Sequence, residues 1–554
     1  MEVILAKKLK VIFLGGVCEI GKNMLAIEYG DNIIIVDSGS SFPTNETPGI
    51  DLVIPDFDYI VKNKDKVRGI FLTHGHEDHI GAVPFLLDEL SNDVPIYASK
   101  LTLGLLTEKL KEHKAKKPKM IVVKGGNVVQ LVCFSIEFIH MSHSILGALA
   151  LAITTPIGVI FHTGDYKIDY TPIDGNMVDL NRIAQIGTEG VLLMLGESTN
   201  VERKGHTLSE LAVGKTLDKL FASNKDSRII VATFASNVHR VQQIVNLAEK
   251  FGRKVCFNGR SMLRIAEVAQ NIGELTYNAA TVIELEELSK FPPKQVCIIS
   301  TGSQGEPMSA LTRMASGDSS IVLSKEDTVI VSSSPIPGNE RMVYNVINDI
   351  YRKGATVIYG SLEEIHASGH ACRDELMLML SLVKPKFFIP VHGEFRHLKQ
   401  HAELAIEMGV KSENIQIPDL GNVFEITKKG LIRCENIESG NTYVDGITVG
   451  DVDSLILRDR KQLSNDGFVV AMARVSLESG KREGVVDIIS RGFQFDDATL
   501  EEMKQIVIDI FDKKDYKTIE DRGLFKSKLR KSLNKYIYQK LKQRPMILPI
   551  IMEI

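Results

Sequence analysis

The stretch GIFLTHGHEDHIGA, residues 69–82, joins an apolar run directly to a dense group of metal-ligating side chains. GIFLT is short, apolar and β-branched, which predicts a buried strand that ends where the group begins. His74, His76, Asp78 and His79 then offer three imidazoles and a carboxylate, a donor set that suits Zn, Mn or Fe. Histidine-rich loops are often solvated surface, but a core strand has no need to end in one, so we favour metal ligation.

Length and composition describe a multidomain globular protein. With 554 residues, 44% hydrophobic and 25% charged, the chain is too long for one hydrophobic core, and we expect three or four domains. Its apolar runs are shorter than a membrane span, and MEVILAKKLK lacks the apolar core of a signal peptide. A net charge of −4 neither indicates nor excludes nucleic-acid binding, because binding depends on a local basic surface.

The six cysteines are scattered and form no CxxC pair. This pattern favours reduced thiols and a cytoplasmic protein over a disulfide framework. They are Cys18, Cys133, Cys256, Cys297, Cys372 and Cys434.

Chemically active residues recur where predicted strands end. Asp37 ends NIIIVD, Asp165 follows VIFHTG and Glu197 follows VLLMLG. His143 closely follows VCFSIEFIHM, and His392 follows KFFIPV much later in the chain. Sites in α/β proteins are commonly built in this way, from loops held by a rigid sheet.

Residues 206–360 alternate strands and helices of their own, among them RIIVATFASN, KVCFNG, QVCIISTG and TVIVSSS. They therefore read as a second α/β unit. If His392, which follows this unit, joins the histidine cluster, the unit is inserted into the first domain and not appended to it.

Several motifs together resemble a known family. H-x-H-x-D-H, a later isolated histidine and the aspartate of TGD resemble the metallo-β-lactamase fold, and HASGH (366–370) with PVHGE (390–394) narrows the resemblance to the β-CASP nucleases. The full set resembles bacterial ribonuclease J nearly end to end, whereas TGSQG or GGVCEIG alone is a weak match. The set is GGVCEIGKNM (15–24), THGHEDHIGA (73–82), HTGDYK (162–167), TFASN (233–237), TGSQGEP (301–307), SSSPIPGNE (332–340) and RPMILPIIMEI (544–554).

The resemblance implies an α/β fold, namely a metallo-β-lactamase αβ/βα sandwich with an inserted α/β β-CASP domain and a small α+β C-terminal domain. The expected limits are 1–205 and 361–447 for the two parts of the metallo-β-lactamase domain, 206–360 for the β-CASP domain, and 448–554 for the linker and C-terminal oligomerisation domain.

It also implies two metal ions, Zn²⁺ or alternatively Mn²⁺. His74, His76 and His143 would hold one ion, Asp78, His79 and His392 the other, and Asp165 would bridge them. In such sites ions about 3.5–4 Å apart lower the pKa of a water molecule and stabilise charge on phosphate oxygens. Asp37 is expected to orient the histidine loop, and a plain strand-end turn is its alternative.

The HASGH segment is expected to bind the RNA phosphate through His366, Ala367, Ser368, Gly369 and His370, because its small residues allow close backbone approach. His370 is also a candidate proton donor to the leaving oxygen. Glu197 would orient a histidine there, although relatives commonly have aspartate at this position. A buried ion pair without catalytic duty is its alternative.

TFASN is expected to bind the terminal phosphate through Phe234, Ala235, Ser236 and Asn237. In the family this pocket underlies preference for a 5′-monophosphate and 5′-to-3′ exonuclease action, and endonuclease action is also known. The segment after His143, HSILGALA, departs from relatives, which are more polar there, but the histidine is retained.

Two basic segments lie outside these motifs. EKLKEHKAKKPK (108–119) could guide the RNA backbone, but a solvated face is the favoured interpretation. KSKLRKSLNKYIYQKLKQR (526–544) has eight Lys or Arg and no acid, and its apolar residues at helical spacing predict a helix whose stripe is core or subunit interface. The histidines at 113, 140, 162, 206, 239, 397 and 401 receive no role.

The resulting prediction is a metal-dependent ribonuclease acting in mRNA decay and rRNA maturation. Its expected partners are RNA, a second copy or more in a homodimer or homotetramer, and members of an RNA-degradation complex, without a membrane. A β-CASP DNA nuclease is one alternative, since contact with a ribose 2′-OH cannot be read from sequence. A weakly active scaffold paralogue is the other.

Overall fold

A computed structural model describes residues 8–553 apart from 45, 91–92, 307, 336–338, 361, 447, 451, 453, 477 and 514–517. Residue 307, residues 336–338 and residue 554, which belong to three of the motifs, lie outside the described residues, as do the predicted limits 361 and 447. The chain divides into two compact units, Met1–Ser41 with Ile54–Asn441, and Phe42–Val53 with Thr442–Ile554.

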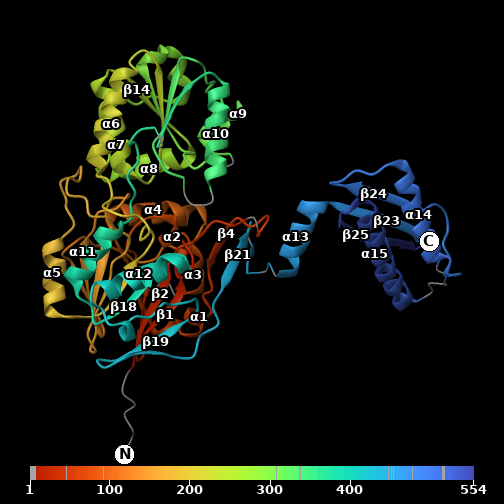
Figure 1. The fold of residues 1–554 in the computed structure, drawn as a ribbon, viewed down its shortest axis with the longest axis horizontal. Coiled ribbons are helices and arrows are strands. Elements are labelled where there is room, and N and C mark those ends of the chain that lie inside the picture. The colour runs from red at the N-terminus through yellow and green to blue at the C-terminus, as the bar shows by residue number, and fades with distance from the viewer. Residues whose placement is uncertain are drawn as a thin grey trace, which may run out of the picture. The chain divides into compact units, whose positions relative to one another are not determined.

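Two sheets packed face to face form the base of the first unit (Figure 1). Phe13, Phe71 and Val36 of one sheet share a single buried cluster with Phe138 and Ile389 of the other. The larger sheet has the order β20 (Leu431–Arg433), β19 (Val423–Ile426), β1 (Leu9–Gly15), β2 (Met24–Tyr29), β3 (Asn32–Val36), β5 (Val67–Phe71), β6 (Ile96–Ala98), β7 (Met120–Val122). The smaller sheet has the order β18 (Phe387–Val391), β12 (Val191–Glu197), β11 (Val159–His162), β10 (Leu149–Thr154), β9 (Phe134–His140), β8 (Val128–Leu131).

Helices cover the outer faces of this sandwich. Ile183, Met379 and Leu404 come from three helices that pack on the smaller sheet in a second core cluster. These are α5 (Leu180–Glu189), α11 (Arg373–Val383) and α12 (Phe395–Glu407). The helices associated with the larger sheet are α1 (Asp58–Lys62), α2 (Glu77–Ile80), α3 (Val83–Glu89) and α4 (Lys100–Glu112), with a 3-10 turn at Lys64–Lys66 and another at Ser412–Asn414 in the second half of the unit.

Strands β12 and β18 are parallel neighbours, with Leu193 opposite Phe387 and Glu197 opposite Val391. All seven residues of β12 are buried, as expected for a near-continuous apolar run in a parallel pair. Residues far apart in the sequence therefore end at the same sheet edge, and the intervening segment is an insertion, as predicted.

The insertion contains a five-stranded parallel sheet with helices on both faces (Figure 1). The predicted fold class is thereby confirmed, whereas the limits 205/206 and 360/361 stay predictions. The strand order is β14 (Lys254–Asn258), β15 (Val296–Ser300), β13 (Arg228–Ala232), β16 (Asp327–Val331), β17 (Thr356–Tyr359). Its helices are α6 (Glu210–Ser223), α7 (Val238–Lys250), α8 (Arg260–Asn271), α9 (Ala310–Ser316) and α10 (Glu340–Arg352), with 3-10 turns at Leu285–Lys290 and Pro293–Gln295.

A buried ionic cluster fastens this insertion to the loop after β11. Arg240 of α7 is fully buried and its Nη2 lies 2.7 Å from Glu210 Oε2. Lys167 Nζ lies 3.6 Å from Glu210 Oε1, and the Glu210 N–H donates to Asp169 at 3.1 Å. Burial alone would raise the pKa of Glu210, but Arg240 and Lys167 hold it at about 2. Since removing one partner of a buried pair costs about 3–5 kcal/mol, the cluster keeps the insertion in register with the neighbouring loop.

The second unit has a sheet of β24 (Asp487–Arg491), β23 (Phe468–Val475) and β25 (Met546–Glu553). Leu529, Leu533 and Ile537 are buried in its core, so the predicted apolar stripe belongs to the core of this unit. The remaining elements of the unit are α13 (Ser454–Asp466), α14 (Asp497–Phe511), α15 (Ile519–Leu541), β21 (Asn441–Asp445) and β22 (Thr448–Val449). One boundary between the two units falls within β4 (Leu52–Pro55). Within the described ranges, no helix is both long and apolar enough to cross a membrane.

Candidate metal centre

The histidine loop follows β5, as the sequence predicted, and Asp37 fixes its shape. Asp37 directly follows β3 with a positive φ of 59°, and its carboxylate faces the loop. The carboxylate accepts hydrogen bonds from Thr73 N, from Thr73 Oγ1 and from His79 Nδ1, each at 2.8 Å. This geometry suits a positioning residue and not a group that touches substrate.

Three imidazoles face one another at one end of the centre. His74 Nε2 lies 3.0 Å and His143 Nε2 lies 3.1 Å from His76 Nδ1. The far nitrogens are engaged, since His143 Nδ1 donates to Gly369 O at 2.7 Å and His74 Nδ1 lies 3.1 Å from Thr73 Oγ1. Because Thr73 donates its own proton to Asp37, it accepts from His74, and the Nε2 lone pairs of His74 and His143 point inward. Inward lone pairs at this separation fit a cation between them.

Burial keeps these three histidines neutral. It lowers the pKa of His74 and of His143 well below the ordinary value, and lowers that of His76 to about 4. Neutral imidazole is the form that ligates a metal, so the first group is ready for binding without loss of a proton.

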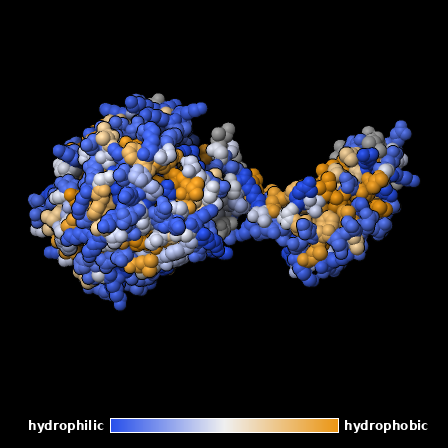
Figure 2. Space-filling model, turned by 90° about the horizontal axis from the view of Figure 1, so that it is seen from above, coloured by the Kyte–Doolittle hydropathy of each residue, from blue (hydrophilic) through white to orange (hydrophobic). Residues whose placement is uncertain are grey.

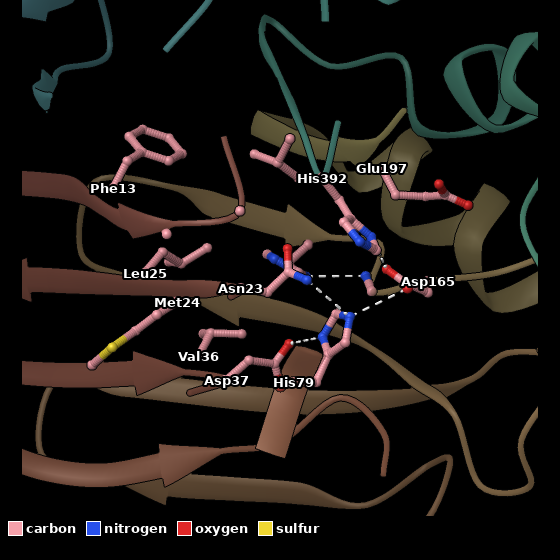
Figure 3. Close-up of a pocket in the computed structure, with 15 residues that line it drawn as sticks. Phe13, Asn23, Met24, Leu25, Val36, Asp37, His79, Asp165, Glu197 and His392 are labelled. Carbon is pink, nitrogen blue, oxygen red and sulfur yellow. Dashed lines mark hydrogen bonds and ion pairs between the residues drawn. The ribbon is translucent and has the colours of Figure 1, made fainter. Parts of the chain in front are cut away.

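The second group combines two carboxylates with two imidazoles, and Figure 3 labels three of its members, Asp165, His79 and His392. His392 Nε2 lies 3.2 Å from Asp78 Oδ2, and its Nδ1 lies 2.8 Å from Asp165 Oδ1. His79 Nε2 lies 3.2 Å from Asp165 Oδ2. The same Asp165 oxygen lies 3.8 Å from His74 Nε2, so Asp165 faces both groups.

In the second group, carboxylates and imidazoles shift one another's pKa values toward their charged forms. Burial would raise the pKa of Asp78 and of Asp165, but the neighbouring imidazoles hold both well below the ordinary value. Burial would likewise lower the pKa of His392, yet Asp165 and Asp78 raise it to about 10. Two ionised carboxylates beside imidazoles form a donor set that fits Zn²⁺ or Mn²⁺.

The HASGH segment closes over the first group. A Cβ on Gly369 would lie 2.6 Å from His143 Cε1, so only glycine fits there. His370 Nδ1 lies 3.5 Å from Glu197 Oε2 and 3.8 Å from Asp165 Oδ2, and its side chain is 23% exposed. Burial would lower the pKa of His370, but the Glu197 and Asp165 carboxylates raise it. His370 is thus a partly open, proton-holding group beside the centre.

Glu197 reaches the HASGH segment and the residue after it with its carboxylate oxygens. It is buried, and its Oε1 accepts from Ala371 N at 3.2 Å while its Oε2 accepts from Thr199 N at 3.1 Å. Both oxygens are therefore fixed while Oε2 faces His370. Glu197 lines a small pocket together with Asp37, His79 and Asp165.

The TFASN loop follows β13. Ser332 links the residue before TFASN to the residue before HASGH by hydrogen bonds. Ser332 N donates to Ala232 O at 2.8 Å, and Ser332 Oγ donates to Ile365 O at 2.6 Å. Asn237 caps α7, accepting from Arg240 N at 3.0 Å and donating to Glu210 at 3.3 Å, so its side chain is committed to the fold. The half-buried residues of the loop are Phe234, Ala235 and Ser236.

Four family models match this chain: Metallo-beta-lactamase superfamily over residues 20–171, Ribonuclease J, beta-CASP domain over 226–350, Zn-dependent metallo-hydrolase RNA specificity domain over 356–418, and Ribonuclease J C-terminal domain over 455–554. Ribonuclease J2 of Bacillus subtilis (strain 168) is 38% identical over 556 residues, covering 99% of both chains. This chain belongs to the ribonuclease J family.

Other ribonuclease J relatives are equally similar. Ribonuclease J of Thermus thermophilus is 40% identical over 98% of this chain and 95% of its own, and Ribonuclease J 1 of Streptococcus pyogenes is 41% identical over 98% and 97%. A solved protein of unknown function from Enterococcus faecalis V583 covers 76% of this chain and 100% of its own with a TM-score of 0.54 at 18% identity, a likeness of fold alone. The chain is accordingly a metal-dependent ribonuclease with a metallo-β-lactamase domain and a β-CASP insertion.

Several residues that shape this ribonuclease J centre were not predicted from the sequence. Asn23 Nδ2 lies 3.1 Å from His79 Nε2 and 3.4 Å from Asp78 Oδ2, and its signal was present in GGVCEIGKNM. Asn200 donates to Ser368 Oγ at 2.8 Å and to His370 O at 3.1 Å. His162, given no role, accepts from Gly164 N at 3.0 Å and orders the turn before Asp165. The signal for His162 was present in HTGDYK, whereas no pattern in the sequence singled out Asn200.

Proposed function

We propose that this ribonuclease degrades RNA from 5′-monophosphorylated ends in the 5′-to-3′ direction. It would also be able to cleave RNA endonucleolytically. It would act in mRNA decay and rRNA maturation in the bacterial cytoplasm, together with partners of an RNA-degradation complex. The observation that carries the proposal is the meeting of His392 and Asp165 with the loop of His74–His79, beside HASGH.

Two Zn²⁺ ions, or Mn²⁺, would occupy the two groups. The ligands would be His74, His76 and His143 on one side, Asp78, His79 and His392 on the other, and Asp165 between them. When bound, these ions supply the Lewis acidity that activates water and neutralises phosphate charge.

The side chains around the ions would position the ligands, donate a proton and bind the phosphate. Asp37 and Thr73 keep the histidine loop in place through their hydrogen bonds. His370, with its pKa raised by Glu197 and Asp165 against the effect of burial, carries the proton that the leaving oxygen needs. The HASGH backbone beside it would receive the scissile phosphate, and the hydrogen bond from Asn200 to Ser368 supports this by holding that loop.

The TFASN loop is the proposed receptor for the 5′-terminal phosphate. Ser236 directly precedes the Asn237 cap of α7, a helix of 13 residues whose N-terminus favours anions. A pocket sized for one phosphate disfavours a 5′-triphosphate by sterics and by charge repulsion.

We expect a several-fold or greater preference in kcat/KM for 5′-monophosphorylated over 5′-triphosphorylated RNA, measured on one labelled oligomer with either end. The Ser236→Ala variant should lose most of this preference because it removes a phosphate hydrogen bond worth about 1.5–3 kcal/mol. Ser223→Ala, an exposed serine of α6 in the same insertion, is the matched control. Equal digestion of both ends by the unaltered enzyme would remove the pocket assignment and leave the nuclease intact.

Discrimination between RNA and DNA is tested with the deoxy counterpart of the same 5′-monophosphorylated oligomer. We expect RNA to be hydrolysed at the higher rate, since only RNA offers 2′-hydroxyls. Equal or faster hydrolysis of the DNA would favour the β-CASP DNA nuclease instead.

A homodimer, or a homotetramer, would form through the open face of the C-terminal sheet. Val470 pairs with Ile489 and Leu548, and Met472 pairs with Ile550, all pointing away from the helix-covered core. Leu548 and Ile550 are 37% and 41% exposed, and Figure 2 shows hydrophobic residues gathered on the surface of this unit. Apolar faces of this kind mark protein–protein contacts.

We expect Ile550→Lys to reduce the molecular mass measured by light scattering to that of a monomer at micromolar concentration, because a charge in an apolar interface is left unpaired. Leu524→Lys, at an exposed leucine of α15, should leave the mass unchanged. A monomeric unaltered protein, or an Ile550→Lys oligomer of full size, would rule this face out.

A further inference from the structure

Helix α15 carries a row of exposed cations that the metal centre does not use. Lys528, Lys531 and Lys535 are exposed and follow one another at i, i+3 and i+7, which puts them on one side of the helix. The other side carries Leu529, Leu533 and Ile537, buried in the core of the C-terminal unit. We call Lys528, Lys531 and Lys535 the α15 basic row.

The charge of this row is not balanced within the protein. Across the described part of the chain, no acidic side chain forms an ion pair with Lys528, Lys531 or Lys535. Lys540, in the last turn of the same helix, is by contrast paired with Glu502 at 2.9 Å. Neighbouring like charges on a helix repel one another, and a polyanion would relieve that repulsion.

An exposed aromatic ring extends the row. Tyr538 is 41% exposed and lies three residues after Lys535, on the same side of α15. Arg544 Cζ lies 4.4 Å and Lys542 Nζ lies 5.5 Å from the centre of its ring. A ring flanked by cations offers a stacking surface for a base next to sites for phosphates.

We propose that the α15 basic row and Tyr538 form a second, sequence-independent contact for single-stranded RNA, separate from the catalytic cavity. The seven helical steps from Lys528 to Lys535 span about 10 Å, roughly three nucleotides of a stacked strand. A membrane surface fits less well, because the apolar side of α15 is buried and cannot insert. The inference rests on the proposed activity toward RNA.

The test compares the full-length triple variant Lys528→Gln, Lys531→Gln, Lys535→Gln with a control that loses three charges elsewhere on the same unit, Lys481→Gln, Lys504→Gln, Lys513→Gln. Binding of a 30-nucleotide 5′-monophosphorylated RNA is measured by fluorescence anisotropy in chelator over a series of salt concentrations. The row variant should bind about tenfold more weakly, and its slope of log K against log salt should be smaller by about 2, at roughly 0.7 per lost phosphate contact. Turnover of a five-nucleotide RNA should stay unchanged.

Tyr538→Ala should weaken binding of the long RNA several-fold, while Tyr538→Phe, which keeps the ring, should bind as the unaltered protein does. Equal affinity and salt slope for the row variant and its control would overturn the inference. Row-dependent binding to phosphatidylglycerol vesicles without an effect on RNA would overturn it in favour of a membrane surface. Failure of the unaltered enzyme to degrade the five-nucleotide RNA would instead refute the proposed activity, which the binding comparison does not require.

Discussion

The His76→Ala variant is expected to lose on the order of a thousandfold in kcat/KM on 5′-monophosphorylated RNA, about 4 kcal/mol of transition-state stabilisation. His76 Nδ1 lies 3.0 Å from His74 Nε2 and 3.1 Å from His143 Nε2, so its removal opens the first group of three. The ion of this group should be lost as well. Metal content after chelator stripping and reconstitution with Zn²⁺ or Mn²⁺ should therefore fall by one ion per chain.

The matched control for this variant is His113→Ala, at an exposed histidine that caps the C-terminus of α4 and belongs to neither proposed ligand group. Both variants should keep the thermal unfolding midpoint of the metal-free protein, which separates loss of metal from loss of fold. Unchanged turnover by His76→Ala would contradict the proposed ligand set and favour the weakly active scaffold paralogue.

The His370→Ala variant should lose about 10²–10⁴-fold in kcat while its metal content stays that of the unaltered enzyme. His370 faces Glu197 Oε2 at 3.5 Å, but it belongs to neither proposed ligand group. Proton donation to the leaving oxygen is therefore lost without loss of the ions. The measurement pairs single-turnover rates at saturating RNA with metal analysis of the same samples.

Glu197→Gln keeps the size of the side chain and removes its charge, so it should lower kcat by about 10–100-fold, the cost typical of an orienting partner. His206→Ala, at a half-exposed histidine of the insertion, should turn over RNA normally. If His370→Ala lost metal in parallel with activity, the histidine would be a ligand, and the assignment as proton donor would be wrong.

The prediction that the second α/β unit is an insertion depended on one residue, His392. The sequence predicts an insertion if His392 joins the histidine loop, and the parallel pairing of β12 with β18 brings His392 there. The strand ends could be predicted because GIFLT, VLLMLGE and KFFIPV are short apolar runs, and such runs have few other ways to be buried. Glu197 and Asp165 were identified for the same reason, since each directly follows a run of this kind.

The hydrogen bonds that hold the loops of the site together could not be predicted from the sequence. Asn237 belongs to a recognisable motif, yet its side chain caps α7 and bonds Glu210, a partner 27 residues away in sequence. Asn200 is held against Ser368 across 168 residues. Neither partner can be inferred from local pattern, because a hydrogen bond depends on distance and direction, which are set by the packing of separate elements.

The amino-acid sequence by itself determined which strands are buried, where metal-ligating side chains leave them, and that α15 has one apolar and one basic side. These properties follow from hydrophobic periodicity and residue type, which act along the chain. Only the tertiary structure decided that three imidazoles meet within about 3 Å, that both Glu197 oxygens are fixed while one faces His370, and that the apolar side of α15 is core. Such placements result from the packing of two sheets and an insertion against one another, and close packing, unlike periodicity, is a property of the whole fold.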